Sequence, residues 1–574
     1  MADEMILRAS TVITMDESLP RAQAITIDTS SGVITDVGDL ADCRHRHPHA
    51  EVTDLGDTVL MPGLIQPHDH PIPAAQLTQL PTQWIAPFVG FPTWDDVEAL
   101  FVKLQRSDPA GQPLMFNGLD RLLLQCPEPT RASLDRFFPD RAVVIFDITG
   151  HALYFNTQAT VLFGWESARP PADRPDARWG RLPDGSSNGV GYETAATMLG
   201  LTAFAPATIA DPLLSLAQWY ATLARNGFTA AGDMAGVKQF MPLMSELAGL
   251  SHCPIRYSMY QPTYDTGAHA APEIPVEQEP FLRKTGVKIW MDGSPSIATA
   301  AVSAPYLDSP QAEIADIPTG RAPGMSALNY SPKEYVELLN RFAGEGWQIA
   351  THINGDVGIG VVLDGYQEAL EGAGLTASDH RWRLEHFSIP SREQCLRAGT
   401  LGITVSMSPF QSLYWGDLYD GVLFEPSFGA RWQPYRDAFD GGLRPTFHND
   451  GYLSPPLPWL NIQNAVTRRS ASGELHGPEQ AVTLQEALAA HTINAAWQQK
   501  RDDELGSITV GKLADLVELS ADPFTVAPES LADTITTRGT WIAGRRSDLA
   551  AFVSEAETLA GSRGVRAHVK HLHC

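Results

Sequence analysis

The sequence is poor in basic residues, in cysteine and in long apolar runs. Its 41 Lys and Arg face 67 Asp and Glu, a formal net charge of −26, which argues against nucleic acid or an anionic membrane as partner because both need basic patches. The five cysteines are odd in number and lack C-x-x-C spacing, so no disulfide framework is expected. No apolar run reaches the ~18 residues of a membrane helix, and no signal peptide is evident at the N-terminus. These absences predict a cytoplasmic protein.

At 574 residues the chain exceeds one ordinary domain. Residues 1–60 contain short alternating strands with turns, and the same texture returns in 501–547. We expect one small β-sandwich made from both chain ends. A tail, 548–574, ends in a cluster of His568, His571, His573 and Cys574, for which metal binding and an ordinary solvated terminus both stay open.

Between the two ends, strand-like and helix-like segments alternate over residues 61–500, as in a parallel α/β fold. The eight segments with strand character are the one ending at His70 and residues 227–233, 255–260, 286–292, 348–352, 382–386, 402–407 and 443–450. Eight such units predict a (β/α)₈ TIM-type barrel. The surplus length, about residues 71–210, forms an insertion after the first barrel strand and includes an extra strand within 141–151. We expect it to wall a substrate pocket, because it leaves the active end of the barrel.

The first barrel strand carries the most informative motif, Met61-Pro-Gly-Leu-Ile-Gln-Pro-His68-Asp69-His70. Residues two apart on a strand point to the same face, so His68 and His70 project side by side. Two neutral imidazoles placed in this way make half of a zinc-type site. An isolated H-x-H pair is weak evidence, since the chain has 17 histidines.

Several later strands also end in residues that can hold a metal. Lys288 lies near the end of the fourth strand, His352 of the fifth, His386 of the sixth and Asp450 of the eighth. The ends of all barrel strands converge on one mouth. Together with the first pair, these residues could hold two divalent ions. Taken singly, His386 could be a core histidine and Lys288 a salt-bridged residue.

The order of these motifs resembles the amidohydrolase superfamily, and within it the YtcJ-like branch, amidohydrolase family 3, whose members include N-substituted formamide deformylases. The resemblance extends to about residue 545. Besides the first motif, it rests on Gly150-His-Ala-Leu-Tyr-Phe-Asn156, Val287-Lys-Ile-Trp-Met-Asp-Gly293, Thr351-His-Ile-Asn-Gly-Asp356, Leu384-Glu-His386 and Gly506-Ser-Ile-Thr-Val-Gly-Lys-Leu-Ala-Asp-Leu516.

The resemblance implies roles for six residues. His68 and His70 would hold the more buried ion and His352 and His386 the more exposed one, with zinc the expected metal. Lys288 would bridge both ions as an N6-carboxylated lysine. Asp450 would bind the buried ion and move a proton between the bridging water and the leaving nitrogen. One ion per chain remains an alternative, because some superfamily members use a single metal.

Six further residues are candidates for substrate binding, and they are His151, Asn156, Asp292, His448, Phe410 and Trp415. His151, which is also a catalytic candidate for polarising the carbonyl, and Asn156 lie in the insertion, where relatives use the Gly-His segment near the pocket. Asp292 could equally cap a turn, and Asp356 could fix a loop. His448 stands two residues before Asp450, where the family commonly has Gly-Ser-Asp or His-Ser-Asp, so it faces the same way. Aromatic residues predict either an apolar pocket that accepts an aromatic group or ordinary core, and they are Phe88, Trp94, Phe410, Tyr414, Trp415 and Trp432.

We therefore expect a metal-dependent hydrolase of a non-peptide amide, acting on a small apolar or aromatic substrate through a metal-bound hydroxide. The alternatives are a deaminase or cyclic-amide hydrolase of the same superfamily, and a non-catalytic scaffold protein on this fold. A degenerate scaffold would have lost at least one of the six ligands, and all six are present. The sequence fixes neither the substrate nor an oligomeric state; a homodimer stays open.

Overall fold

The computed structural model describes residues 4–107, 111–173, 177–192, 194–209 and 211–563. Its centre is a sheet of eight parallel strands in the order β19-β18-β17-β16-β15-β14-β13-β6. The strands are β6 (Leu64–Asp69), β13 (Phe228–Asp233), β14 (Arg256–Pro262), β15 (Leu282–Trp290), β16 (Gln348–Ile353), β17 (Arg383–His386), β18 (Thr404–Met407) and β19 (Thr446–Phe447). The predicted barrel is thus confirmed. β19 contacts β6, but no ladder of hydrogen bonds joins these two strands among the residues that the structure describes, so the barrel is nearly closed.

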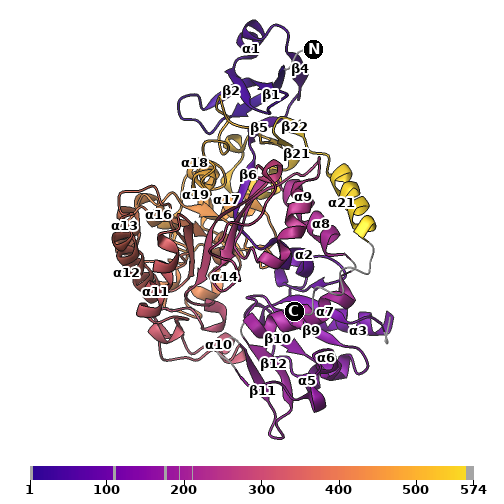
Figure 1. Cartoon of the computed structure of the whole chain (residues 1–574). Helices are drawn as coiled ribbons and strands as arrows, with labels where there is room; N and C mark the ends of the chain where they lie inside the picture. The colour runs from indigo at the N-terminus through magenta and orange to yellow at the C-terminus, as the bar shows by residue number, and fades with distance from the viewer. Residues whose placement is uncertain (1–3, 108–110, 174–176, 193, 210, 564–574) are drawn as a thin grey trace.

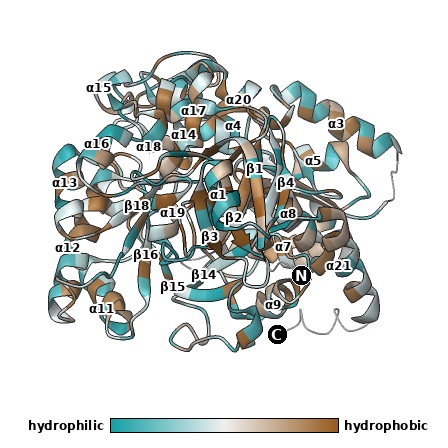
Figure 2. Ribbon diagram, turned by 90° about the horizontal axis from the view of Figure 1, so that it is seen from above, coloured by the Kyte–Doolittle hydropathy of each residue, from teal (hydrophilic) through white to brown (hydrophobic). Residues whose placement is uncertain are grey.

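Helices surround this barrel and bury their apolar sides on it. They include α8 (Pro212–Arg225), α9 (Met241–Ala248), α11 (Pro332–Ala343), α12 (Asp356–Gly372), α13 (Arg392–Thr400), α14 (Pro409–Tyr419), α16 (Tyr435–Asp440), α17 (Pro458–Thr467), α18 (Leu484–Ala490), α19 (Ile493–Gln498) and α21 (Leu549–Arg563). Figure 2 shows hydrophilic and hydrophobic residues mixed along the outer helices. Local signals set their starts: Ser331 caps α11 in a capping box with Glu334, and Pro332 occupies its first position.

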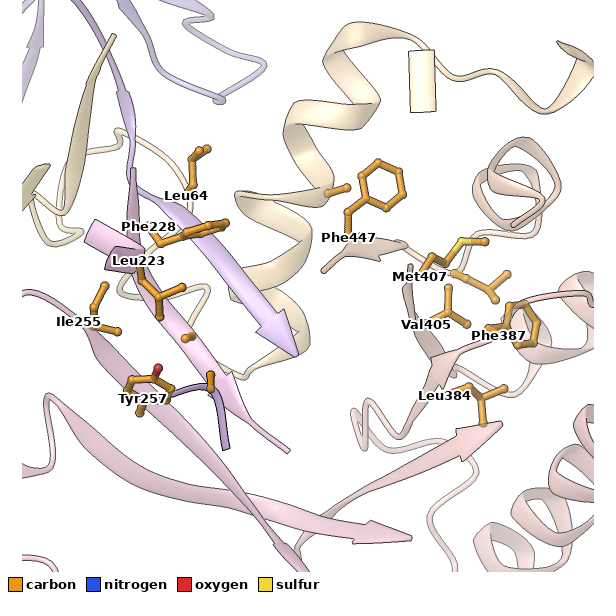
Figure 3. Close-up of a cluster of buried hydrophobic side chains, with 14 of the residues drawn as sticks. Leu64, Leu223, Phe228, Ile255, Tyr257, Leu384, Phe387, Val405, Met407 and Phe447 are labelled. Carbon is orange, nitrogen blue, oxygen red and sulfur yellow. The ribbon is translucent and has the colours of Figure 1, made fainter. Parts of the chain in front are cut away.

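The main core lies between the strands and these helices. Residues that point outward from the strands, such as Phe228, Leu384 and Val405, are fully buried. Figure 3 shows them on both sides of the barrel, with Leu64 and Leu223 beside Phe228. This packing fixes the register of each strand, because a slip by one residue would exchange the outward and inward faces. It therefore also fixes which side chains reach the barrel interior.

Strands from both chain ends share one sheet, as predicted. They are β1 (Glu4–Ile13), β2 (Arg21–Asp28), β3 (Ile34–Gly38), β4 (Glu51–Asp54), β5 (Val59–Pro62), β20 (Leu516–Leu519), β21 (Thr537–Ile542) and β22 (Arg545–Arg546), with α1 (Leu40–Arg46) beside them. β5 pairs antiparallel with β20, which joins the two ends directly. In Figure 1 this sheet lies at one end of the molecule. The predicted His-rich cluster at 568–574 lies outside the described residues.

The insertion forms a second α/β unit at the opposite end of the barrel (Figure 1). Its six-stranded sheet comprises β7 (Gln83–Trp84), β8 (Leu114–Leu119), β9 (Val143–Asp147), β10 (Ala152–Phe155), β11 (Arg178–Arg181) and β12 (Ser187–Tyr192). Its helices are α2 (Pro71–Leu77), α3 (Trp94–Ser107), α4 (Arg121–Leu124), α5 (Arg131–Phe137), α6 (Thr157–Leu162) and α7 (Thr194–Thr208). Two separate apolar clusters cover its sheet. Because β6 ends where the insertion begins, the insertion covers the end of the barrel at which the candidate ligands lie.

Among the described helices, none combines the length and the apolar character that crossing a membrane would require.

Candidate metal centre

The two histidines at the end of β6 point together into the barrel mouth. Their rings are 5.2 Å apart between centroids, and the two Nε2 atoms are 3.3 Å apart. Both Nε2 atoms face one carboxylate oxygen, Asp450 Oδ1, at 3.1 Å from His68 and 3.2 Å from His70. The predicted convergence of the first and last strands is therefore present.

The backbone at the ends of two strands is turned by left-handed residues. His386, the last residue of β17, has φ +70°, and Asp450, three residues beyond β19, has φ +60°. Side chains other than glycine adopt this conformation at a cost, and such residues concentrate at functional sites. Here the turn directs an imidazole and a carboxylate into the same mouth.

A second group of ligand-type residues shares Asp450 with the first. It consists of His386, His448 and Asp450, all buried. His448 stacks on His68 with ring centroids 4.4 Å apart, and its Nε2 lies 2.9 Å from the Ser408 hydroxyl. His386 Nδ1 lies 3.0 Å from the same hydroxyl and 3.8 Å from Asp450 Oδ2. The structure thus places His448, predicted as a substrate contact, among the candidate ligands.

His352 lies in the same cluster but faces differently. Its ring is 4.4 Å from that of His386, and its Nε2 lies 3.4 Å from the Gly293 carbonyl and 3.7 Å from Asp292 Oδ1. It is absent from the two groups in which ligand atoms converge. Asp292 accepts hydrogen bonds from the backbone amides of Ala301, Asn354 and Gly355. Its carboxylate therefore organises the loop backbone around His352, which is the capping alternative left open above.

Burial sets the charge of the ligand histidines. It lowers the pKa of His352, His386 and His448 well below the usual value, so all three are neutral near pH 7 and have a lone pair to offer. For Asp450, burial would raise the pKa, but interactions with the neighbouring His68 and His386 outweigh burial and hold the pKa well below the usual range. The Asp450 carboxylate is thus ionised beside the neutral imidazoles of His386 and His448.

Lys288 is buried on β15 and its Nζ has no hydrogen-bond partner within the described part of the chain. Burial lowers its pKa to about 8, against the opposing charges of Glu385 and Asp450. An amine in this state exists partly in its neutral, nucleophilic form near pH 7 to 8. An ammonium group cannot bind a metal, because it has no lone pair.

The polar atoms at the centre fit a bound cation. His68 Nδ1 lies 2.6 Å from Glu385 Oε2, so that nitrogen carries the proton and the lone pair of Nε2 faces Asp450. Asp450 Oδ1 has no hydrogen bond although two imidazole nitrogens lie within 3.2 Å of it. A lone pair that faces a carboxylate oxygen is repulsive, and a divalent ion between the two atoms relieves the repulsion.

Comparison with known proteins shows the family to which the chain belongs. A family model described as "Amidohydrolase family" matches residues 51–547. The chain belongs to the amidohydrolase family.

Two curated amidohydrolase relatives match nearly the whole chain. An N-substituted formamide deformylase from Arthrobacter pascens is 27% identical over 549 residues, covering 93% of this chain and 96% of that protein. A putative amidohydrolase, YtcJ of Bacillus subtilis (strain 168), is 23% identical and covers 91% and 95%. Among solved structures, an uncharacterized metal-dependent hydrolase from Pyrococcus horikoshii OT3 superposes with a TM-score of 0.69 at 20% identity, covering 92% of this chain and 99% of that one. This likeness supports the amidohydrolase fold.

Sequence reasoning missed the residues that hold the ligands in place. Arg383 contacts both oxygens of Glu385 and donates to the Pro67 carbonyl at 3.0 Å. Burial would raise the pKa of Glu385, but Arg383 and His68 hold it far below the usual value. The carboxylate is thus ionised and orients His68. The motif Leu384-Glu-His386 contains Glu385. Alternation along β17 would have placed Arg383 and Glu385 on one face of the strand.

Tyr452 is a second residue that the sequence did not indicate. Its hydroxyl oxygen would lie only 2.3 Å from a Cβ atom placed on Gly150, and Gly150 has φ +73°. Gly150 is therefore required twice, by its backbone conformation and by the close approach of Tyr452. This contact seats the insertion loop on the barrel mouth. The centroids of the Tyr452 and His70 rings are 6.2 Å apart there.

The predicted insertion residues divide into two kinds. Asn156 is fully buried, and its side chain accepts from the amides of Val143 and Ala159 and donates to the carbonyls of Phe138 and Arg141. With all four hydrogen bonds used, Asn156 holds the insertion together and has none left for a substrate, which corrects its assignment. His151, in contrast, follows Gly150, against which the Tyr452 hydroxyl packs at the barrel mouth, and its backbone amide donates to the Thr149 hydroxyl.

Most of the predicted aromatic residues gather next to the centre. Phe410, Trp415 and Trp432 belong to one buried cluster, and Phe88 and Tyr414 pack against it. Phe410 stands edge-on to His448 with ring centroids 5.9 Å apart. Trp94 is the exception, since it packs in the insertion's own core against Phe101. The carboxylate of Asp356 accepts hydrogen bonds from the backbone amide and the hydroxyl of Ser303, and Asp356 therefore fixes a loop.

Proposed function

We propose that this amidohydrolase hydrolyses the C–N bond of a small, uncharged amide with an apolar or aromatic substituent, using divalent metal bound at His68, His70, His386, His448 and Asp450. The observation that carries the proposal is the orientation of two imidazole nitrogens toward one ionised carboxylate oxygen. The amide class is supported by a relative named N-substituted formamide deformylase. Zinc suits the nitrogen-rich donor set.

Each residue around the centre has a distinct task in this proposal. A divalent ion at these residues would polarise a carbonyl and lower the pKa of a water molecule. Asp450, ionised and between the two groups, accepts a proton at a carboxylate oxygen and returns it to the leaving nitrogen. His151 lies on the insertion loop next to Gly150, which packs against Tyr452, and would donate a hydrogen bond to the substrate carbonyl. The insertion excludes bulk water from the barrel mouth.

Lys288 is proposed to carry a carboxyl group on its Nζ. The ammonium first loses one proton to solvent; the neutral amine then attacks carbon dioxide, a nitrogen–carbon bond forms as one carbon–oxygen π bond breaks, and a second proton leaves to solvent, so a cation becomes an anion. Burial, a pKa of about 8 and an Nζ without a hydrogen-bond partner in the described residues support this reaction. The product would supply two oxygens next to Asp450, enough to bridge two ions.

The test combines a substrate panel with metal analysis. Formamides, acyl amides, lactams, hydantoins and aminated heterocycles are assayed for released formate, amine or ammonia, with zinc-loaded and chelator-treated protein. The proposal expects amine release from an open-chain amide, lost on chelation and restored by zinc. Ammonia release from the heterocycles alone, or ring opening alone, would instead support the deaminase or the cyclic-amide hydrolase.

A further inference from the structure

A pocket beside the metal centre lies between four parts of the chain. It is lined by Ile148 and Thr149 from the insertion, Ser296 from the loop after β15, Phe410, Trp415 and Tyr419 from α14, and Leu453 from the segment after β19. Phe410 also stands edge-on to the candidate ligand His448. Thr149 accepts a hydrogen bond from the backbone amide of His151, the candidate for binding the substrate carbonyl. A substrate at the centre can therefore extend one substituent into this pocket.

The space between these walls is small. The cavity measures about 30 Å³, whereas an engineered apolar cavity that binds benzene measures roughly 150 Å³. The aromatic side chains thus occupy the volume that an aromatic substituent would need. What remains accommodates a group of roughly one to three heavy atoms.

The walls are held firmly. Trp415 donates its indole N–H to Asp120, a buried carboxyl of the insertion, at 2.7 Å. The Tyr419 ring stacks on Trp432 with centroids 4.2 Å apart. Rigid walls resist expansion, because enlarging a well-packed core forces side chains out of their preferred rotamers and shifts the backbone.

The chemistry of the lining selects against charge. The described residues that line the pocket carry no charged side chain. Its polar groups include the hydroxyls of Ser296 and Tyr419, which are 3.5 Å apart and so only weakly bonded to each other. An ionised substituent would lose its hydration here without gaining a partner of opposite charge.

We infer that this pocket is a size-selective subsite for one small uncharged substituent of the substrate, and that Phe410 is the residue that limits its size. The inference rests on the proposed function and narrows its substrate class. A larger or aromatic group must point elsewhere, on the other side of the scissile bond.

The test uses two amide series with zinc-loaded protein. One series varies the acyl group from formyl to benzoyl, and the other varies the nitrogen substituent from methyl to benzyl. Each includes a carboxylate-bearing member of small size. In one series kcat/KM should be at least about tenfold lower for the phenyl member than for the two-carbon member. In the same series kcat/KM should be lower by a similar factor for the carboxylate-bearing member than for the two-carbon member.

Phe410→Ala should then raise kcat/KM for the phenyl member relative to the small one by at least about tenfold, through added space. Phe410→Leu, which disturbs packing less, should give a smaller shift in the same direction. Phe524→Ala is the matched control, since this aromatic is 41% exposed and remote from the pocket; it should leave the ratio unchanged. An unchanged ratio in both Phe410 variants, or equal rates for small and phenyl members of both series in the parent, would overturn the inference.

The two proposals fail separately. If the parent hydrolyses no amide of either series, the proposed function fails. The subsite is then measured by calorimetric binding of two pairs of amides to the zinc-loaded chain, N-methylformamide with N-phenylformamide and N-methylacetamide with N-methylbenzamide. The inference expects the smaller amide to bind more tightly in at least one pair and Phe410→Ala to reverse the order in that pair; tighter binding of the larger amide in both pairs, or an order that Phe410→Ala leaves unchanged, would overturn it.

Discussion

The two candidate ligand groups share Asp450 but are held by different means. In the first, Glu385 binds His68 Nδ1 at 2.6 Å and is itself bound by the buried Arg383. In the second, both histidines are within hydrogen-bond distance of one neutral hydroxyl, that of Ser408. Its oxygen lies 3.0 Å from His386 Nδ1 and 2.9 Å from His448 Nε2. A charged carboxylate fixes an imidazole's tautomer and raises its basicity more than a hydroxyl does. We therefore expect the first group to bind metal more tightly than the second.

The largest effect is expected from Asp450→Asn, which removes the residue common to both groups. Turnover should fall by about 10³-fold or more, because a proton acceptor and a ligand are lost together. Metal content should fall at both sites. Asp364→Asn, at an exposed position, is the control and should change neither quantity. An active Asp450→Asn variant would show that another group moves the proton.

Lys288→Ala should reduce bound metal and activity strongly, since it removes the proposed bridge. Removing bicarbonate from the parent should have the same effect, reversed by adding it back. Lys284→Ala is a matched control because Lys284 lies on the same strand and burial also lowers its pKa to about 8. Full metal content in Lys288→Ala would contradict the bridging role.

Glu385→Gln and Ser408→Ala compare the two supports directly. The first should weaken metal binding about 10- to 100-fold, through loss of the carboxylate that orients His68. The second should weaken binding of the other ion by less. Thermal unfolding is measured in parallel, because Glu385→Gln leaves the buried Arg383 without its anion. Equal effects of the two changes on metal affinity would remove the distinction between the groups.

The smallest effect concerns pH, and it tests burial away from the metal centre. Burial lowers the pKa of His491 to about 4. Its unfolded pKa is ~6.5, so the unfolded chain gains a proton first as the pH falls. Stability should therefore decrease from about pH 6.5 down to about pH 4 and change little with His491 above that range. Denaturant unfolding of His491→Gln should show a shallower decrease; an identical pH profile would contradict this account.

Much of the architecture could be predicted from the sequence, and the reasons differ between parts. The alternation of strand-like and helix-like segments identified the eight strands. The convergence of strand ends at the barrel mouth placed His68, His70, His386 and Asp450 together. The left-handed turn at Asp450 depends on loop conformation, which no periodicity encodes. The direction of the His352 ring depends on its neighbours, the Gly293 carbonyl and Asp292, which are distant in the sequence. Asn156 was assigned to substrate because its motif lies near the pocket; its four backbone hydrogen bonds become visible only in the folded insertion. Aromatic residues indicated a pocket, but only the structure shows how little space they leave.

The central claim is that Asp450 joins two metal sites of unequal strength. A stepwise zinc titration of chelator-treated protein, followed by calorimetry and metal analysis, tests it directly. The account predicts two ions per chain with distinct affinities, of which Ser408→Ala weakens only the weaker and Asp450→Asn weakens both. A single ion per chain, or two ions that bind Asp450→Asn as tightly as the parent, would contradict it.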